Sequence, residues 1–397
     1  MEQPEEKPKI SYETLWKFII RPPRHNYKIE QLNGSHFWFQ NKYYLRKDYD
    51  IVSSEGYIMK CSFFEPRDSC RPKKIMPVVL YLHGNASSRK EGDNHLLELL
   101  KRDINLFIVD LPGCGISEGE YISLGYHERH EVKILVDFID NLPGVGKIGL
   151  WGRSMGAATT MLYAHKDKRI KAIVMDSPFA DFNLLARELV LKHIKLPNCL
   201  IQGALKIIKK TVKKKNGLDI DRLKPIEAAP KTTQPAMFII ANEDELIDNK
   251  HSKMLINFYG GKDVSLKECH GSHNDMRPED IIRDIGAFFY KHLVNDSKED
   301  NSITIVNKFD IFDMDENYED LKADNIKKEN DENIIENEQN NNEKKIINDE
   351  YLTKIEVKKN KEDETEILPK KILGIFHESE KEKQNIDSSD YINENKV

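Results

Sequence analysis

The chain has 397 residues, of which 39% are hydrophobic and 32% charged, and its formal net charge at pH 7 is −6. Residues 295–397 contain 29 acidic and 16 basic residues, whereas residues 1–294 contain 38 acidic and 45 basic residues, so the two parts have net charges of −13 and +7. Neither part shows the basic–aromatic pattern of a nucleic-acid-binding protein. No apolar run approaches the length of a membrane span.

The cysteines and the N-terminal sequence indicate the compartment. The five cysteines form no C-x-x-C pair, which argues against a zinc site and against a disulfide framework; they are Cys61, Cys70, Cys114, Cys199 and Cys269. The N-terminal sequence MEQPEEKPKISYETLW is charged and contains no signal-peptide core and no lipidation motif. We therefore expect a cytoplasmic protein with reduced thiols.

Short apolar runs alternate with amphipathic stretches through residues 1–294. Residues 36–52 alternate in the manner of an antiparallel hairpin. The strands predicted after it are continuously apolar in several cases, which is typical of strands covered on both faces. This order predicts an α/β fold, with a mostly parallel central sheet and helices on both faces. The predicted strands are residues 57–64, 78–84, 105–113, 148–152, 172–178, 236–242 and 264–270, and the predicted helices are residues 94–102, 125–142, 154–166, 251–260 and 279–293.

Two segments depart from this rhythm. Residues 295–397 form an acidic tail of low complexity, rich in Asn, Lys and Glu, whose few apolar residues cannot offset the entropy of ordering. We predict that most of this tail is disordered, and its partner is unknown. Residues 180–234 interrupt the strand order with helical patterns, and we predict a small helical lid above the carboxyl ends of the strands, where open α/β sheets bind ligands.

One helix of the predicted lid has two distinct faces. Apolar residues recur at helical spacing at Ile201, Leu205, Ile208 and Val212. Lysines mark another face, at Lys206, Lys209, Lys210 and Lys213, with Lys214 and Lys215 beyond it. The lysines form either a solvated helix face or a surface for weak contact with an anionic membrane.

The stretch IGLWGRSMGAATTM, residues 148–161, places Gly152-x-Ser154-x-Gly156 between a predicted strand and a predicted helix. This is the pattern of a nucleophile elbow. Side chains at the flanking positions of such a turn would clash with neighbouring backbone, so Gly152 and Gly156 fit sterically. The turn exposes Ser154 at a helix N-terminus, where backbone N–H groups favour developing negative charge. We therefore predict that Ser154 is a nucleophile.

An activated serine also needs donors for an oxyanion. The sequence LYLHGNASS ends a predicted strand with His83-Gly84-Asn85. Gly84 permits a close approach, so we predict that the backbone N–H groups of Asn85 and Met155 form an oxyanion hole. His83 precedes the serine, in the wrong order for the base, and is interpreted as structural. The glycine-rich residues 110–119 fit no phosphate-binding spacing and are interpreted as a turn.

The acid and the base should follow the serine in that order. Asp244 comes just after a predicted strand in FIIANEDELID, and His273 lies in the loop after the last predicted strand. Asp248 is a weaker candidate for the acid because it lies further into the next helix, and Asp176 is interpreted as structural. His270 adjoins its strand and is expected to be buried, so His273 is the preferred base.

Five segments together resemble the serine-aminopeptidase-like α/β-hydrolases: HGN, DLPGCGISEGEYISLGYHE, IGLWGRSMGA, DSPFADF and GSHNDMRP. With FIIRPPR at residues 18–24, the chain is similar to a eukaryotic, cytosolic branch of that group. The resemblance covers residues 11–293. It implies an α/β-hydrolase fold with a small helical lid, and it implies the roles predicted above for the nucleophile, acid, base and oxyanion donors.

These observations predict a serine hydrolase that needs no cofactor and no metal. The apolar lid positions favour a carboxylester or a thioester, and the substrate is a small molecule or an acylated protein. A serine peptidase is the second candidate. A binding protein with this fold and no catalysis is the third, although all three triad candidates are present.

Overall fold

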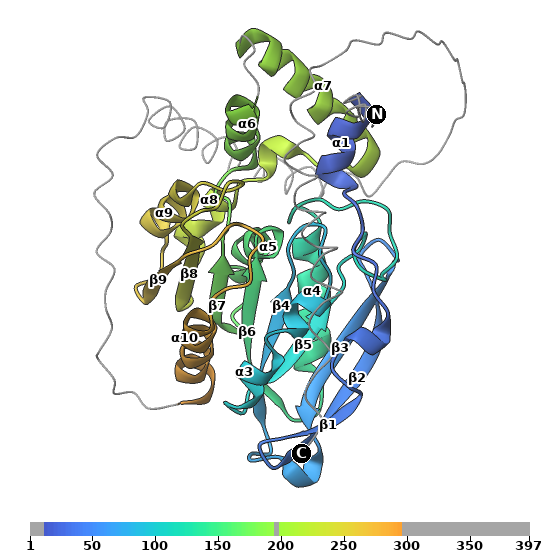
Figure 1. Ribbon diagram of the computed structural model, residues 1–397, viewed down its shortest axis with the longest axis vertical. Coiled ribbons are helices and arrows are strands. Elements are labelled where there is room, and N and C mark those ends of the chain that lie inside the picture. The colour runs from blue at the N-terminus through green and yellow to red at the C-terminus, as the bar shows by residue number, and fades with distance from the viewer. Residues whose placement is uncertain (1–11, 194–197, 296–397) are drawn as a thin grey trace, which may run out of the picture. The chain divides into compact units, whose positions relative to one another are not determined.

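The computed structural model describes residues 12–193 and 198–295 (Figure 1). Its nine strands form one sheet in the order β1-β2-β3-β5-β4-β6-β7-β8-β9. The prediction for the acidic tail, residues 295–397, falls almost entirely outside the described residues. The strands are β1 (His36–Phe39), β2 (Lys42–Val52), β3 (Ile58–Pro66), β4 (Met76–Leu82), β5 (Asn105–Val109), β6 (Val145–Arg153), β7 (Ile170–Asp176), β8 (Ala236–Ala241) and β9 (Val264–Cys269).

The sheet is antiparallel at one edge and parallel over the rest. Strands β1, β2, β3 and β5 pair antiparallel, and every pair from β5 through β9 is parallel. The hairpin predicted within residues 36–52 is confirmed as β1 and β2. Its turn places Gln40 and Asn41 at φ values of 47° and 60°, as a tight hairpin connection requires. The mostly parallel α/β fold expected from the sequence is thereby confirmed.

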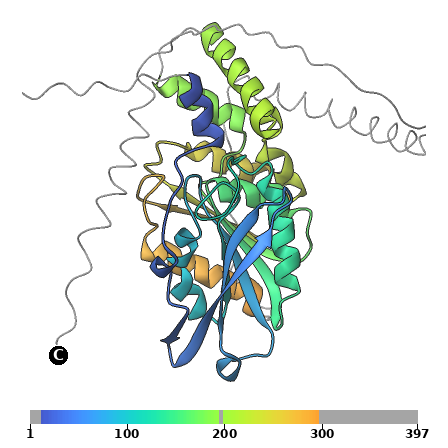
Figure 2. The same cartoon turned by 90° about the vertical axis from the view of Figure 1, so that its right-hand side faces the viewer.

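Helices cover both faces of the sheet (Figure 2). Helices α3 and α10 pack together on one face, and α4 and α5 pack together on the other. The core under α10 includes Trp151 and Phe289, both almost fully buried. A Cβ at Gly149 would lie 2.8 Å from the Phe289 ring, so the glycine allows this close contact. The helices of these layers are α2 (Lys90–Asp93), α3 (Leu96–Leu100), α4 (Glu128–Asp140), α5 (Met155–Ala164), α9 (Asn249–Phe258) and α10 (Glu279–Phe289).

Between β7 and β8 the described residues form helices and no strand, which confirms the predicted helical insertion. Helices α6 and α7, together with α1, lie beyond the carboxyl ends of the parallel strands in both views (Figures 1 and 2). This is the edge at which open α/β sheets bind ligands. The elements are α1 (Tyr12–Ile20), α6 (Phe182–His193), α7 (Asn198–Asn216) and α8 (Pro225–Ala228).

Helix α7 packs against α1. Among the side chains that the structure describes on these two helices, the buried apolar ones are Trp16, Ile20, Ile208 and Val212. The predicted apolar face of α7 is therefore a packing surface over part of its length. Among the described residues, no helix combines the length and the apolar character needed to cross a membrane.

The lysine face of α7 is partly engaged within the protein. Lys209 and Lys213 form ion pairs of 2.6 and 2.7 Å with Asp221 and Asp219. Lys215 Nζ lies 4.3 Å from the centre of the Trp16 ring. The remaining lysines of this face, Lys206, Lys210 and Lys214, are exposed.

Candidate active site

Ser154 stands at the turn between β6 and α5, in a backbone conformation that is costly for a residue with a side chain. Its φ is 52° and its ψ is −113°. The backbone N–H of Ser154 donates to the Asp176 carbonyl at 2.8 Å, which holds the turn against β7. A Cβ at Gly152 would overlap the Gly156 carbonyl, and one at Gly156 would overlap the Leu82 carbonyl. Neither glycine position therefore has room for a side chain.

The structure brings together the three side chains that the sequence singled out. Asp244 lies in the loop after β8, and His273 lies in the loop after β9. His273 Nδ1 is 2.7 Å from Asp244 Oδ2, and His273 Nε2 is 3.0 Å from Ser154 Oγ. Because an ionised carboxylate only accepts, Nδ1–H donates to Asp244 and Nε2 accepts from the serine hydroxyl. This is the arrangement in which a histidine can remove the serine proton.

The surroundings of Asp244 keep its carboxyl group ionised. Its side chain is buried, and its Oδ1 accepts backbone N–H groups of Leu246 and Ile247 at 2.9 and 2.8 Å. Burial acts to raise the pKa of Asp244, but the hydrogen bond and charge of His273 and the two backbone donors outweigh it and lower the pKa. The ionised carboxylate fixes the His273 tautomer.

The competing candidates lie elsewhere. Asp248 directly precedes α9 rather than lying within it, and it accepts the Lys250 backbone N–H at 2.9 Å, so it caps that helix. The Asp176 carboxylate pairs with Arg277, whereas His273 pairs with Asp244. The expectation that His270 is buried is wrong: its side chain is 93% exposed and contacts Glu243. The reason is that His270 follows β9, the edge strand, and faces solvent rather than a neighbouring strand.

The loop after β4 passes directly beside Ser154. A Cβ on Gly84 would lie 3.8 Å from the Ser154 Cβ, and Asn85 follows at once. Among the described residues, the Asn85 backbone N–H has no hydrogen-bond partner. Met155 is the first residue of α5, where a backbone N–H has no partner within its helix. Within the part of the chain that the structure describes, neither predicted oxyanion donor has a hydrogen-bond partner; Met155 follows Ser154 in sequence, and Asn85 follows Gly84, which lies beside Ser154.

Hydrogen bonds of His83 and of the glycine-rich residues 110–119 stabilise the loops near Gly84. His83 is fully buried; its Nδ1–H donates to the Gly84 carbonyl at 2.8 Å, and its Nε2 accepts the Leu111 N–H at 3.2 Å. In residues 110–119 the Asp110 carboxylate accepts the Ile116 N–H at 3.1 Å and the Arg89 N–H at 2.6 Å. The Asp110 carboxylate therefore stabilises the conformation of this loop. Within residues 12–193 and 198–295, no three His, Cys, Asp or Glu side chains gather as metal ligands would.

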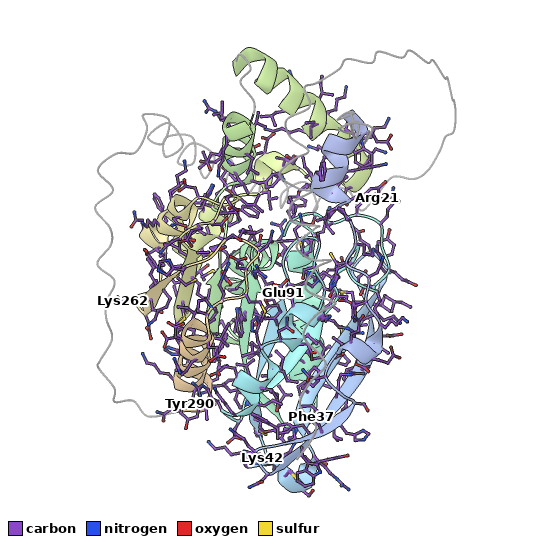
Figure 3. The ribbon with its side chains drawn as sticks, in the orientation of Figure 1. Arg21, Phe37, Lys42, Glu91, Lys262 and Tyr290 are labelled. Atoms are coloured by element: carbon purple, nitrogen blue, oxygen red, sulfur yellow. The ribbon has the colours of Figure 1, made fainter. Side chains whose placement is uncertain are left out.

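Charged side chains next to Ser154 and His273 were not predicted from the sequence. Arg153 Nη1 lies 3.5 Å from Glu91 Oε1, and Arg277 Nε lies 2.9 Å from Asp176 Oδ2. Glu91 lies in the interior of the fold (Figure 3), with a side chain only 12% exposed. Burial acts to raise the pKa of Glu91, but the Arg153 charge and the hydrogen bonds from Ser87 and Tyr81 together outweigh it and lower the pKa to about 2. The available signals were the position of Arg153 inside Gly-x-Ser-x-Gly and that of Arg277 just after His273.

A histidine near these charged side chains makes stability sensitive to pH. The His95 ring stacks on Trp151 at 4.5 Å between centres, and burial lowers its pKa from 6.5 to about 4, although Glu91 acts in the opposite direction. The unfolded chain therefore takes up this proton first, so the contribution of His95 is full above pH 6.5 and is lost as the pH falls towards 4. We expect urea unfolding to show a loss of about 1–2 kcal/mol between pH 7 and pH 5 that His95→Phe removes. The exposed His270→Phe is the control; an unchanged pH dependence in His95→Phe would contradict this prediction.

Comparisons with known proteins agree with this architecture. A family model described as alpha/beta hydrolase fold matches residues 77–204. The uncharacterised protein YqkD of Bacillus subtilis is 26% identical over 226 residues, which are 56% of this chain and 71% of that protein. The lysophosphatidylserine lipase ABHD12 of Gallus gallus is 31% identical over 119 residues, 28% of this chain and 30% of the lipase. The solved structure of the Pyrococcus furiosus esterase Pf2001 has a TM-score of 0.52 at 21% identity, covering 69% of this chain and 98% of the esterase.

These likenesses support the fold more than any single activity. The chain spans less than a third of the length of the lipase, and at 21% identity the esterase structure is informative about the fold alone. The resemblance to the serine-aminopeptidase-like branch stays a prediction. The family match covers β4 to the start of α7, and it includes the strand–turn–helix unit that carries Ser154. With its mostly parallel sheet, helices on both faces and an insertion after β7, the chain has the α/β-hydrolase fold.

Proposed function

We propose that this protein is a serine hydrolase that cleaves a carboxylester or thioester acyl bond through an acyl-enzyme intermediate. The observation that carries the proposal is the hydrogen-bonded chain from Asp244 through His273 to Ser154, ending on a serine at φ 52°. Strain of this kind costs about 1–3 kcal/mol and is concentrated at functional sites. The name of one similar protein, a lysophosphatidylserine lipase, also favours acyl-ester hydrolysis.

In the proposed acylation step, Ser154 Oγ attacks the acyl carbon while His273 Nε2 accepts the hydroxyl proton. The carbonyl oxygen becomes an oxyanion between the N–H groups of Asn85 and Met155. Asp244 stabilises the imidazolium that forms. Collapse of the intermediate breaks the bond to the alcohol or thiol, which leaves with the proton from His273.

In the proposed deacylation step, water replaces the leaving group. His273 accepts a proton from the water as its oxygen attacks the acyl-Ser154 carbon, and the same backbone donors hold the oxyanion. Collapse releases the carboxylic acid and returns the proton to Ser154 Oγ. The sequence of steps balances without a cofactor or a metal.

The insertion supplies the proposed substrate surface, mainly through α6. Lys192 Nζ donates to the Glu245 carbonyl at 2.9 Å, which ties the end of α6 to the loop of Asp244. The neighbouring Leu191 side chain is 47% exposed. An exposed apolar side chain on the helix that the acid loop contacts favours an apolar acyl group, on a small molecule or on an acylated protein.

The proposal is tested by comparing classes of substrate on the full-length protein, with Ser154→Ala as the blank. We expect Ser154-dependent hydrolysis of p-nitrophenyl esters or acyl thioesters, with a preference set by acyl chain length, and no hydrolysis of aminoacyl p-nitroanilides. Turnover of the anilides would favour the serine peptidase. A folded protein that turns over none of the three classes would favour the binding protein.

A further inference from the structure

Two arginines converge on the main chain of His273. Arg153 Nη2 donates to the His273 carbonyl at 2.6 Å, and Arg277 Nη2 donates to the same oxygen at 3.3 Å. The first arginine precedes Ser154, and the second follows His273 by four residues. The loop of the proposed base is thereby held from two sides, one of them attached to the nucleophile turn.

Arg277 lies inside its own loop. Its Nη1 donates to the Ser272 and Asp275 carbonyls at 3.0 and 3.2 Å, while its Nε donates to both Asp176 carboxylate oxygens at 3.0 and 2.9 Å. The Arg277 and Asp176 side chains are each only 3% exposed. One planar guanidinium thus serves three backbone carbonyls and a carboxylate, a task that the single ammonium of lysine cannot match.

Asp176 joins this loop to the nucleophile. It is the last residue of β7 and lies in register with Arg153 of β6. Its backbone carbonyl accepts the Ser154 N–H at 2.8 Å, and its carboxylate binds Arg277. A displacement of the Asp176 carboxylate would therefore change the placement of the His273 loop relative to Ser154.

The second pair connects the same loop to the predicted oxyanion donors. Glu91 Oε1 accepts the Tyr81 hydroxyl at 2.7 Å and faces Arg153, and Glu91 Oε2 accepts the Gly84 N–H at 3.3 Å. Gly84 directly precedes Asn85. The Glu91–Arg153 pair therefore extends from the Gly84 loop to the His273 carbonyl.

We propose that Arg277 with Asp176, and Arg153 with Glu91, are positioning residues that hold His273 Nε2 against Ser154. The inference rests on the proposed function. The reacting atoms need this support because the base lies in a loop, and a displacement of about 1 Å at a reacting group can cost about 100-fold in rate. Stability alone is a weak reason for these pairs, because replacing a buried ion pair by apolar residues is often neutral or stabilising.

The first test compares Arg277→Met with Arg169→Met in the hydrolysis of p-nitrophenyl butyrate. Arg169 is the matched control, since it pairs with Asp167 and Asp137 near the opposite end of β7 from Asp176. We expect Arg277→Met to lower kcat about 100-fold with KM unchanged, Arg277→Lys to recover part of the loss, and Arg169→Met to retain kcat. Equal losses of kcat in Arg277→Met and Arg169→Met would overturn the proposal.

The second test asks whether Arg277 acts through His273. In a His273→Ala background, Arg277→Met is expected to change the residual rate by less than about threefold, because the group that it positions is already absent. If Arg277→Met costs the same factor with and without His273, its role is structural and the proposal is wrong.

A third measurement does not depend on turnover. The low-field proton NMR signal of His273 Nδ1–H, which donates to Asp244, is expected in the wild type and in Arg169→Met and to be lost or shifted in Arg277→Met. The isosteric Asp176→Asn is expected to shift it too, and serves if Arg277→Met does not fold. An unshifted signal in these variants overturns the positioning role. A wild type that shows this signal but no Ser154-dependent turnover contradicts the proposed function instead.

Discussion

Replacing Ser154 by Ala is expected to lower kcat for ester hydrolysis by about 10⁶-fold and to abolish labelling by a fluorophosphonate probe. The magnitude follows from removal of the nucleophile in a well-studied serine protease, where the remaining rate comes from substrate binding and oxyanion stabilisation. The fold should tolerate the change, since the Ser154 hydroxyl is bonded to His273 Nε2 and the turn is held by its backbone. The measurement is in-gel labelling followed by single-turnover kinetics.

Ser177 provides a matched control for that experiment. It follows the next strand, β7, with a similar φ of 50°, but its hydroxyl lies 3.3 Å from Arg277 Nη2 and not against a histidine. Ser177→Ala should still be labelled, because the probe reacts with the serine whose proton is removed. Labelling that persists in Ser154→Ala and disappears in Ser177→Ala would show that Ser177, not Ser154, is the reactive serine, and would contradict the prediction.

Replacing Asp244 by Asn is expected to lower kcat by about 10⁴-fold with little change in KM. The amide keeps the shape but removes the negative charge that stabilises the His273 imidazolium, and it no longer enforces the tautomer with hydrogen on Nδ1. The two backbone donors to Oδ1 hold the side chain in place, so the loss should appear in the chemical step. The measurement is the pair of kinetic constants for one ester.

Asp248→Asn is the control for this prediction, because Asp248 was the alternative candidate for the acid. Asp248 lies four residues further along and caps α9, a role that Asn fills equally well. We expect its kcat to stay within about twofold of the wild type, since surface changes of this kind rarely alter free energies by more than about 0.5 kcal/mol. A large loss of kcat in Asp248→Asn with none in Asp244→Asn would show that Asp248, not Asp244, acts on His273.

The parts of the site that follow local rules could be predicted from the sequence. The glycines around Ser154 are required by backbone contacts within a few residues, so the turn is visible in a short stretch of letters. Asp244 and His273 could be placed because each follows a strand, and the carboxyl ends of parallel strands meet at one edge. Neither inference needed the identity of the neighbouring strand.

The predictions that were wrong or missing concern contacts between segments that are distant in sequence. His270 was expected to be buried because it adjoins a strand, but whether β9 is an edge strand is set by the order of all nine strands. The contacts of Arg153 and Arg277 could not be predicted from the sequence, since they require β6 and β7 to lie in one particular register. Periodicity predicted α7 and its apolar face, but it could not indicate that α1 packs against that helix.

The position of the helical insertion has a consequence for how this protein can evolve. The segment leaves the sheet after β7 and returns at β8, and these two strands are direct parallel neighbours. Doubling the length of such a connection costs only about 0.6 kcal/mol of closure entropy. The insertion can therefore be lengthened, shortened or rebuilt while the strands that carry Ser154, Asp244 and His273 keep their pairing. Under the proposed function, changes in this segment alone would alter the accepted substrates and leave Ser154, Asp244 and His273 in place.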